Sequence, residues 1–451
     1  MSTAAVDIVG TALDRLGGDG VLGLACSGGG DSLALLLIAS DWADRNGRRL
    51  HVFTVDHRLR PEAAEEAREV SRIAAELGWP CDILPWQEAR AGAGIQARAR
   101  KARHRLLANA CQTHGIDRLM LAHTRDDQSE TVWLRLAAGG SWRSAAAMAE
   151  TAPSPVWPEG RDLTLIRPCL SIDRADLRQI LAAAGRRWVD DPSNEDCRYA
   201  RIRTRGRLCQ LGEAGFETAR FAALATTLQA LIQAERAAAW RAAGTCVGIE
   251  AWGGARIDRA TWSALAPAIR FCLLDALVMA VSGEEQSPTR SRLEPIDAAL
   301  CDGRPMSGCG IRLLEERDGA VWMVRDAGAV LGRVDRPVPE PWCETAASSG
   351  GRQSTWIFDG RFELANRQRK LDWRLLGEAY QGVSDRAILD PVPGPARSGL
   401  LVGERNGQVV EIAGFAAADG SATMRSLLAH RFCRRLLPHP AARWFDEPNA
   451  A

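Results

Sequence analysis

A glycine-rich segment, Ser27-Gly28-Gly29-Gly30-Asp31-Ser32, has the residue types and spacing best suited to chemistry in this chain. It follows the apolar run 21–25 and opens the apolar segment 33–38, so a strand is expected to turn directly into a helix. Such a turn points unpaired backbone N–H groups and the positive end of a helix dipole at one small volume. Glycines let an anion approach the backbone closely. The segment therefore predicts a phosphate site, with Asp31 placed to cap the helix or to help hold a divalent cation.

The loop lacks the two commonest nucleotide signatures. No Gly-Lys-Ser/Thr follows at Walker A spacing, and the only lysines in the chain are Lys101 and Lys370. No third glycine completes the dinucleotide fingerprint. The pattern Ser-Gly-Gly-x-Asp-Ser instead resembles the pyrophosphate loop of the PP-loop ATPases, which split ATP between its α and β phosphates. A glycine-rich turn without a ligand is the alternative, and the six matching residues between a strand and a helix argue against it.

Four further segments place polar side chains beside expected strands and helices. Asp56 follows a strand over 50–55, Arg103 lies on an arginine-rich helix over 94–114, and His123 and Asp127 follow a strand over 118–122. The fourth segment, 190–207, has five arginines in its last ten residues. The carboxyl ends of parallel strands meet at one edge of a sheet, so these groups are expected near the loop. Taken singly, each segment also fits a simpler interpretation: a solvated strand end, acids that cap a helix, or solvated arginines.

Together, the segments resemble those of one PP-loop branch, the tRNA(Ile)-lysidine synthase family. That family has the loop, a V-D-H-x-L-R strand end, an I-Q-x-x-A-R helix start, an H-x-x-D-D-Q-x-E-T helix and a D-P-S-N segment followed by arginines. All five occur here in the same order over residues 21–207. One departure is Thr124, where the family often has a second histidine.

The resemblance implies an ATP-dependent ligase that acts on the isoleucine tRNA with a CAU anticodon. ATP adenylates the C2 oxygen of the wobble cytidine, pyrophosphate leaves, and the side-chain amine of free L-lysine displaces AMP. ATP and Mg²⁺ are the implied cofactors, and tRNA(Ile) and free L-lysine the implied partners. Because a lysine amine has a pKa of about 10.4, the attack needs a base. Asp127 and His123 are the first candidates for it, and Asp56 is a weaker one.

The resemblance also assigns the individual site residues. The ATP-binding residues are Ser27, Gly28, Gly29, Gly30, Asp31, Ser32 and Asp56; the Mg²⁺ ligands are Asp31 and Asp127; the catalytic residues are Asp127, His123, Arg103 and Arg205.

A chain of 451 residues is too long for one compact core and predicts two or three domains. Alternating strand and helix patterns over residues 1–210 predict an α/β domain with a doubly wound parallel sheet. Alanine- and leucine-rich residues then predict a helical domain over 211–331. After the proline-rich segment 333–341, a small α+β domain is expected over 342–451, with a hairpin around Asn406-Gly407 and a basic tail helix over 424–437.

Composition narrows the function classes. Hydrophobic residues make up 46% and charged residues 25%, as in an ordinary soluble protein, and the net charge of +1 points to no partner. The amino-terminal segment lacks the features of a signal peptide and no apolar run could span a membrane, so a cytoplasmic protein is expected. A homodimer is left open.

Two alternatives remain. None of the twelve cysteines forms a C-x-x-C pair, which argues against the first, a PP-loop tRNA thiolase. An amidotransferase-type synthetase belongs to the same class, but no glutaminase signature is evident. The second alternative is a non-catalytic tRNA-binding protein built on a nucleotide-binding fold.

Overall fold

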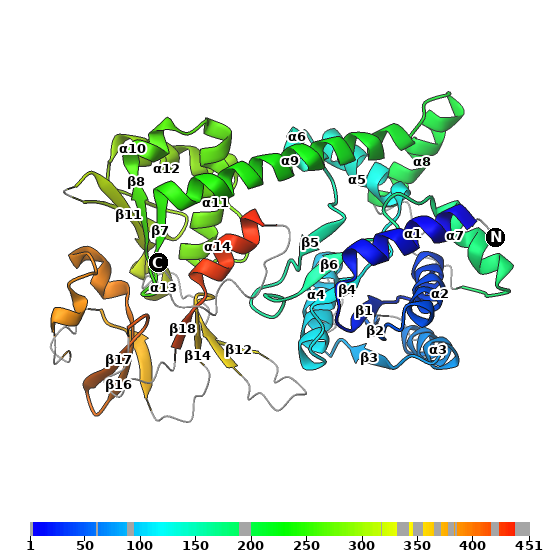
Figure 1. Cartoon of the computed structure of the whole chain (residues 1–451), viewed down its shortest axis with the longest axis horizontal. Helices are drawn as coiled ribbons and strands as arrows, with labels where there is room; N and C mark the ends of the chain where they lie inside the picture. Colours follow the sequence, from blue (N-terminus) through cyan, green and yellow to red (C-terminus); the bar gives the residue numbers. More distant parts are fainter. Residues whose placement is uncertain are drawn as a thin grey trace. The chain divides into compact units, whose positions relative to one another are not determined.

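The computed structural model describes residues 3–59, 62–87, 94–188, 200–316, 318–331, 342–345, 355–364, 371–377, 383, 386–415 and 424–437. The chain divides into two compact units, Met1–Gln233 and Ala234–Ala451, and each is described here by itself (Figure 1). The predicted segments 190–199 and 333–341 lie outside the described residues, so the boundaries expected at 331 and 342 stay predictions.

The first unit is built on a six-stranded sheet of order β3-β2-β1-β4-β6-β5. Every neighbouring pair is parallel except β5 with β6. The strands are β1 (Leu22–Ala25), β2 (Leu50–Asp56), β3 (Cys81–Pro85), β4 (Arg118–Met120), β5 (Thr151–Pro153) and β6 (Thr164–Ile166). The helices are α1 (Thr3–Leu16), α2 (Gly30–Arg45), α3 (Ala63–Glu76), α4 (Ile95–Thr113), α5 (Arg125–Ala137), α6 (Trp142–Ala145), α7 (Arg174–Ala183), α8 (Ala200–Glu213) and the start of α9 (Ala219–Cys246).

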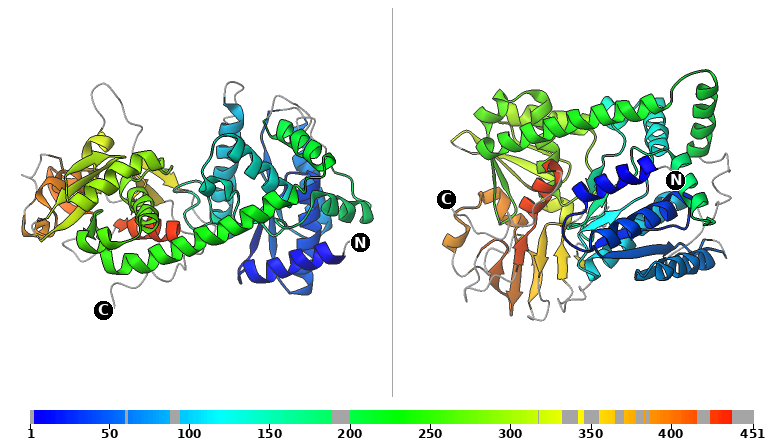
Figure 2. Two further views of the ribbon diagram at one scale, coloured as in Figure 1. Left: turned by 90° about the horizontal axis from the view of Figure 1, so that it is seen from above. Right: turned by 45° about the vertical axis from the view of Figure 1, so that its right-hand side comes forward.

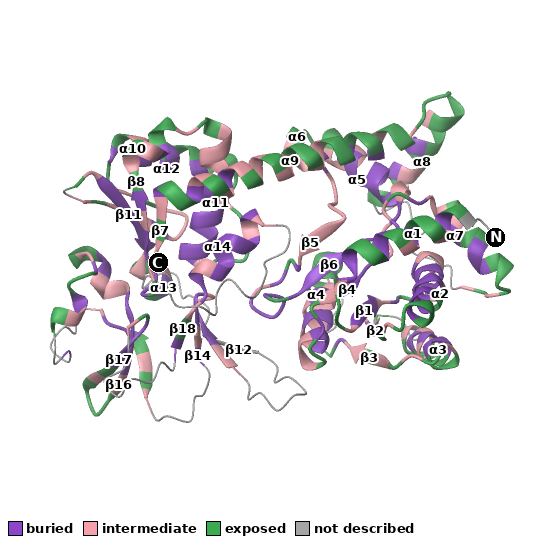
Figure 3. Cartoon of the chain, viewed as in Figure 1, coloured by how far each residue is buried: buried purple, intermediate pink, exposed green. Residues whose placement is uncertain are grey.

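Helices cover both faces of this sheet, as the predicted doubly wound fold requires (Figure 2). The side chains of β2 alternate between the faces. Leu50 and Val52 pack into a core with α1, α2, α3 and α7, whereas Phe53 packs with Leu107 and Cys111 of α4 on the other face. Because both faces are buried, β1 and β2 are apolar along most of their length and are buried in Figure 3.

The strand order reverses at β1, which lies between β2 and β4. Ligands of open α/β sheets bind outside the carboxyl ends of the strands at such a reversal. The glycine loop follows β1 and the His123 segment follows β4, so both lie at this point. The edge strand β5 is the exception to the parallel arrangement: it is only three residues long and runs antiparallel to β6.

The second unit is not helical throughout its first part. A five-stranded antiparallel sheet, β7-β8-β11-β10-β9, accompanies the helices. The strands of this sheet are β7 (Val247–Ile249), β8 (Ala255–Asp258), β9 (Met306–Gly308), β10 (Ile311–Glu315) and β11 (Ala320–Arg325). The helices of this part of the unit are the end of α9, α10 (Arg259–Ala264), α11 (Pro267–Ser282), α12 (Arg290–Asp302) and α13 (Ala327–Leu331). Strands of three to six residues leave a weak signal beside long alanine-rich helices, so the pattern over 211–331 predicted helices alone.

The last part of the chain is mixed α and β, as expected. One sheet has the order β12 (Trp342–Thr345), β13 (Thr355–Phe358), β14 (Phe362–Leu364) and β18 (Met424–Ser426); the other has β15 (Asp372–Leu375), β16 (Leu401–Arg405) and β17 (Gln408–Ile412). Short 3-10 helices, Arg386–Leu389 and Gly394–Gly399, lie between β15 and β16. The hairpin of β16 and β17 is confirmed, with Asn406 (φ 53°) and Gly407 (φ 78°) both left-handed at its turn.

The tail segment begins as strand β18 and continues as helix α14 (Leu428–Leu436). Its arginines are used inside this unit. The Nε of Arg431 donates to the Met279 carbonyl oxygen at 2.8 Å, and Arg435 pairs with Asp275 at 2.6 Å. No helix among the described residues is long and apolar enough to cross a membrane.

Candidate active site

The glycine loop is held in place by Ser32, on the first turn of α2. Its Oγ accepts a hydrogen bond from the Ser27 N–H at 3.1 Å and donates to the Gly29 carbonyl oxygen at 3.0 Å. Gly28 has a φ of +81°, which L residues rarely adopt, and a Cβ there would lie 3.3 Å from Val70 Cγ2. No side chain of the described residues caps α2 at Gly29, so the N–H groups at its start have no side-chain cap. This is the geometry of an anion site at a helix start.

Three carboxylates gather beside the loop and share one guanidinium group. Asp31 lies on α2, and Asp127 and Glu130 lie on α5; we call these three residues the acid cluster. Arg174, the first residue of α7, donates from Nε to Asp31 at 3.0 Å and from Nη2 to Asp127 at 3.1 Å. Its Nη1 lies 3.5 Å from Glu130 Oε1. The structure thus joins the start of α2 to the start of α5 through α7.

The two aspartates of the acid cluster respond differently to burial. Burial raises the pKa of Asp31 and the charge of Asp127 adds to the rise, although Arg174 opposes both. At Asp127 burial also favours the neutral form, but Arg174 and the Thr124 backbone N–H outweigh it, so the pKa of Asp127 is lowered. Asp127 forms a capping box with Thr124, whose N–H donates to the carboxylate at 2.9 Å. The threonine at the position where a second histidine was expected therefore helps hold this carboxylate ionised.

Arg205 reaches the same cluster from α8. Its Nε donates to Glu130 Oε1 at 2.9 Å. The Glu130 side chain is only 2% exposed, and its second oxygen is buried without a hydrogen-bond partner among the described residues. Three carboxylates thus face two guanidinium groups, those of Arg174 and Arg205. Carboxylate oxygens are the protein ligands that Mg²⁺ prefers, so Asp31 and Asp127 fit the predicted metal role in their chemistry.

Arginines gather on the other side of the site without such compensation. Burial comes first in lowering the pKa values of Arg100, Arg103, Arg135 and Arg167, and the charge of Arg100 or Arg201 adds to each shift. The set, which we call the arginine cluster, is Arg100 and Arg103 of α4, Arg135 of α5, Arg167 after β6, and Arg201 of α8. The pKa values of Arg103 and Arg167 fall to about 10. The Nε atoms of both are buried without a hydrogen-bond partner, and no carboxylate in the described part of the chain pairs with any of the five.

His123 lies between the two clusters. Burial and the Arg167 charge lower its pKa to about 3, although Asp127 opposes the shift. The ring is therefore neutral at pH 7, and its Nδ1 is buried without a hydrogen-bond partner in the described part of the chain. A group with so low a pKa is a weak proton acceptor near neutral pH.

Asp56 ends β2 at the same edge of the sheet. It is buried, and its Oδ1 accepts the Arg58 N–H at 2.9 Å. The neighbouring His57 has a pKa lowered by burial and then by Arg103, which places the Asp56 segment near the arginine cluster. The structure thus brings the predicted residues to one edge of one sheet, while their separate roles stay predictions.

Sequence reasoning missed Arg174 and the wider arginine cluster as site residues. Arg174 is the first residue of α7, the helix that follows β6, and β6 is a parallel strand that ends at the same edge of the sheet. This position after a parallel strand was the signal in the sequence that could have identified Arg174 as a site residue. Glu130 lies inside the H-x-x-D-D-Q-x-E-T segment, but the pattern alone did not separate it from its neighbours. Arg135 and Arg167 lie on different elements, so only the fold brings them together.

Comparison with known proteins agrees with the geometry. The family model described as "PP-loop domain" matches residues 10–211. The tRNA(Ile)-lysidine synthase of Hyphomonas neptunium is 36% identical over 298 residues, which cover 65% of this chain and 79% of that protein. The tRNA(Ile)-lysidine synthase of Caulobacter vibrioides is 33% identical over 440 residues, covering 95% of this chain and 96% of that protein.

Among solved structures, a U34-tRNA thiolase from Methanococcus maripaludis matches with a TM-score of 0.43 and 14% identity, over 51% of this chain and 78% of that one. The similarity in sequence, by contrast, extends over nearly the whole chain, and the loop, the acid cluster and the His123 segment lie together at the edge of the sheet where open α/β folds bind their ligands. This chain belongs to the tRNA(Ile)-lysidine synthase family.

Proposed function

We propose that this chain uses ATP to attach free L-lysine to C2 of the wobble cytidine in tRNA(Ile) with a CAU anticodon. The observation that carries the proposal is the near-complete coverage of a tRNA(Ile)-lysidine synthase by this sequence. The geometry supports it, because an anion-binding loop, carboxylates and uncompensated arginines lie at one edge of one sheet.

The glycine loop, Ser27–Ser32, acts in the first half-reaction. The C2 oxygen of cytosine attacks the α phosphorus of ATP, and the bond from that phosphorus to the bridging oxygen breaks, so that pyrophosphate leaves. Backbone N–H groups at the start of α2 stabilise the charge that develops on the departing group. Asp56, at the end of β2, is placed for the adenosine end of the nucleotide.

In the second half-reaction the amine of lysine attacks C2, and AMP departs with the oxygen. The ammonium form of lysine must first be bound and then lose a proton. Asp127 is the candidate for both tasks, because Arg174 and Thr124 keep it ionised. His123, with a pKa of about 3, is better suited to hydrogen-bonding the substrate through its unpartnered Nδ1 than to accepting the proton.

The arginine cluster supplies positive charge that no carboxylate of the described residues neutralises. The more buried members of the cluster, such as Arg167, are costly as cations unless a ligand compensates their charge. A phosphate group of tRNA, or the phosphate of the adenylated base, provides that compensation. On α4, Arg103 is the residue that we assign to phosphate binding. Arg205 connects α8 to the acid cluster through its hydrogen bond to Glu130.

Mg²⁺ is the second proposed cofactor, with Asp31 and Asp127 as its ligands. When bound, the ion would neutralise charge on the phosphate oxygens of ATP. Arg174 now lies against both carboxylates, so it and the ion compete for the same oxygens. We further propose that the protein acts in the cytoplasm, where its ATP, lysine and tRNA occur together.

The proposal is tested by incubating the protein with ATP, Mg²⁺ and a CAU tRNA(Ile) transcript, with or without radiolabelled lysine. Label in the tRNA with stoichiometric AMP release is the expected result, and a transcript with uridine at the wobble position is the control that should stay unlabelled. A reaction that needs a sulfur donor instead of lysine would favour a thiolase. Binding of tRNA without ATP cleavage would favour a non-catalytic protein.

A further inference from the structure

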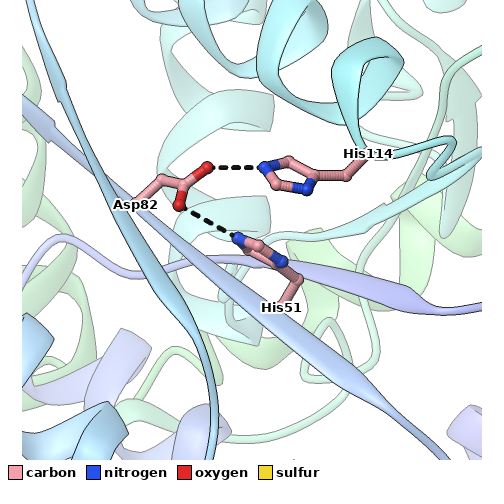
Figure 4. A group of neighbouring side chains, drawn as sticks. All are labelled: His51, Asp82 and His114. Carbon is pink, nitrogen blue, oxygen red and sulfur yellow. Dashed lines mark hydrogen bonds and ion pairs between the residues drawn. The ribbon is translucent and has the colours of Figure 1, made fainter. Parts of the chain in front are cut away.

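A second cluster of chemically competent side chains lies at the opposite end of the same sheet. His51 is near the start of β2, Asp82 is near the start of β3, and His114 caps the carboxyl end of α4 (Figure 4). Asp56, at the ATP end of β2, is five residues beyond His51, or about 16 Å along an extended strand. The cluster is therefore separate from the candidate active site.

The three side chains converge on one point. Asp82 Oδ2 lies 2.7 Å from His114 Nε2, and Asp82 Oδ1 lies 3.3 Å from His51 Nε2. The two imidazole rings are 4.0 Å apart between centroids. One ligand atom from each residue lies within 4.8 Å of the other two. Figure 4 shows both rings with a nitrogen turned toward the same carboxylate.

The fold fixes this arrangement through the sheet register. Phe53 pairs with Asp82 across β2 and β3, and His51 precedes Phe53 by two residues, so all three side chains share the face that α4 covers. The His51 ring stacks on Phe53 with centroids 4.7 Å apart and an interplanar angle of 19°. Since β3 is the edge strand, the cluster lies at the border of the sheet.

The cluster is incompletely satisfied without a further ligand. His51 is buried, and its Nε2 has no properly aligned hydrogen-bond partner among the described residues despite its closeness to Asp82. One carboxylate is thus divided between two rings. Burial, and then the neighbouring His114, lower the pKa of His51, although Asp82 opposes the shift.

We propose that His51, Asp82 and His114 bind a divalent transition-metal ion of the Zn²⁺ class. Two imidazole nitrogens and a carboxylate oxygen are a common ligand set for such ions, whereas Mg²⁺ and Ca²⁺ prefer oxygen ligands alone. Bond lengths of about 2.0–2.2 Å put tetrahedral ligand atoms about 3.3 Å apart, close to the spacing here. Asp82 and His114 are partly exposed, which leaves the fourth position to water. A bound ion would tie the edge strand β3 and the end of α4 to β2.

The test is a titration of the metal-free full-length protein with Co²⁺, whose visible absorption reports ligand type and geometry. We expect one equivalent to bind with a tetrahedral or five-coordinate spectrum, Zn²⁺ to displace it, and the Tm to rise with saturation. Asp82→Asn and His114→Ala should each weaken binding by at least about 10-fold and remove the rise in Tm.

Two controls separate this site from other metal-binding groups. Cys81→Ser changes the thiol next to Asp82 and should keep both affinity and spectrum. Asp41→Asn changes an exposed carboxylate of α2 that pairs with Arg45, and it should also have no effect. The proposal is overturned if no ion binds below millimolar concentration. It is also overturned if binding survives in Asp82→Asn and His114→Ala, or if the Co²⁺ spectrum is that of a thiolate lost in Cys81→Ser.

Discussion

The acid cluster and the arginine cluster lie at the same edge of the sheet but differ in how their charges are balanced. In the acid cluster, three carboxylates are matched to Arg174 and Arg205 at distances of 2.9 to 3.5 Å. In the arginine cluster, burial and then neighbouring guanidinium charges lower the pKa values of Arg100 and Arg103. One half of the site is therefore complete in the free protein, and the other half is not.

The two clusters are therefore suited to different tasks, the binding of cations and the binding of phosphate groups. The acid cluster holds Asp127 ionised and its three carboxylates in position before substrate arrives, which favours binding of cations such as Mg²⁺ and the lysine ammonium group. The positive charges of the arginine cluster repel one another, and a bound phosphate offsets this repulsion. The cluster therefore favours binding of the tRNA and the adenylated base. The predictions below follow from this contrast.

The largest effect is expected at Asp127. Asp127→Asn keeps the shape of the side chain but removes the charge, so lysine transfer should fall by about 10²–10⁴-fold, the range typical of a lost acid–base group. The rate of labelled lysine incorporation measures it. Asp44→Asn, an exposed carboxylate on α2, is the matched control and should retain the wild-type rate. Wild-type turnover by Asp127→Asn would remove this residue from the mechanism.

Arg174→Met should destabilise the free protein by about 3 kcal/mol, because it leaves buried carboxylates without their counter-ion. Urea unfolding at pH 7 gives the free energy, and Arg45→Met, which breaks an exposed pair, should change it by less than about 0.5 kcal/mol. If the ion and Arg174 share ligands, millimolar Mg²⁺ should stabilise Arg174→Met more than it stabilises the wild type. Equal Mg²⁺ effects on the two proteins would argue against Asp31 and Asp127 as the ligands.

As the pH falls, the protein should first lose stability at His104, which is influenced by the arginine cluster. Burial, followed by Arg103, Arg100 and Arg167, lowers the pKa of His104 to about 3, while the unfolded chain takes up this proton near pH 6.5. Between these values the unfolded state binds more protons, so stability falls as the pH falls, by about 2 kcal/mol from pH 7 to pH 5 for this residue. Asp127, whose pKa is lowered, gives up its contribution only below about pH 4. Unfolding of wild type and His104→Asn at the two pH values measures the effect, and parallel losses would contradict it.

The smallest effect on stability is expected at Arg103, where a substitution should leave the stability unchanged or raise it. Arg103→Met removes a partly buried cation whose Nε has no hydrogen-bond partner among the described residues, so the free protein should keep its stability or gain about 1 kcal/mol. Lysine transfer should nevertheless fall at least about 10-fold because the phosphate loses a charged donor. A destabilisation as large as that of Arg174→Met would mean that the two clusters are not balanced differently.

The local parts of the site could be predicted from the sequence. The glycine loop and the Asp127 helix are each short, contiguous patterns between a strand and a helix, and the backbone geometry follows from the residues themselves. The parallel sheet covered by helices on both faces also followed, because alternating strands and helices leave few topologies. The hairpin at Asn406-Gly407 was predictable for the same local reason.

The remaining features depend on contacts between distant residues. Arg174 lies 143 residues from Asp31, and nothing in its own neighbourhood distinguishes it from other arginines at helix starts. The antiparallel sheet of the second unit has strands too short to give a period, and the partners of each strand decide its formation. The tail was expected to form a basic helix, and its arginines Arg431 and Arg435 bond to α11, a pairing that helical periodicity cannot reveal.

A single comparison of lysine incorporation tests the proposed function and the division of the site together. Wild type, Asp127→Asn and Arg103→Met are incubated with ATP, Mg²⁺, labelled lysine and CAU tRNA(Ile), and the Tm of each protein is measured in the same buffer. We expect the wild type to label the tRNA with one AMP released per lysine, both variants to lose most of this activity, and Arg103→Met alone to match or exceed the wild-type Tm. Absence of label with the wild type, or an unchanged rate in Asp127→Asn, would contradict the mechanism.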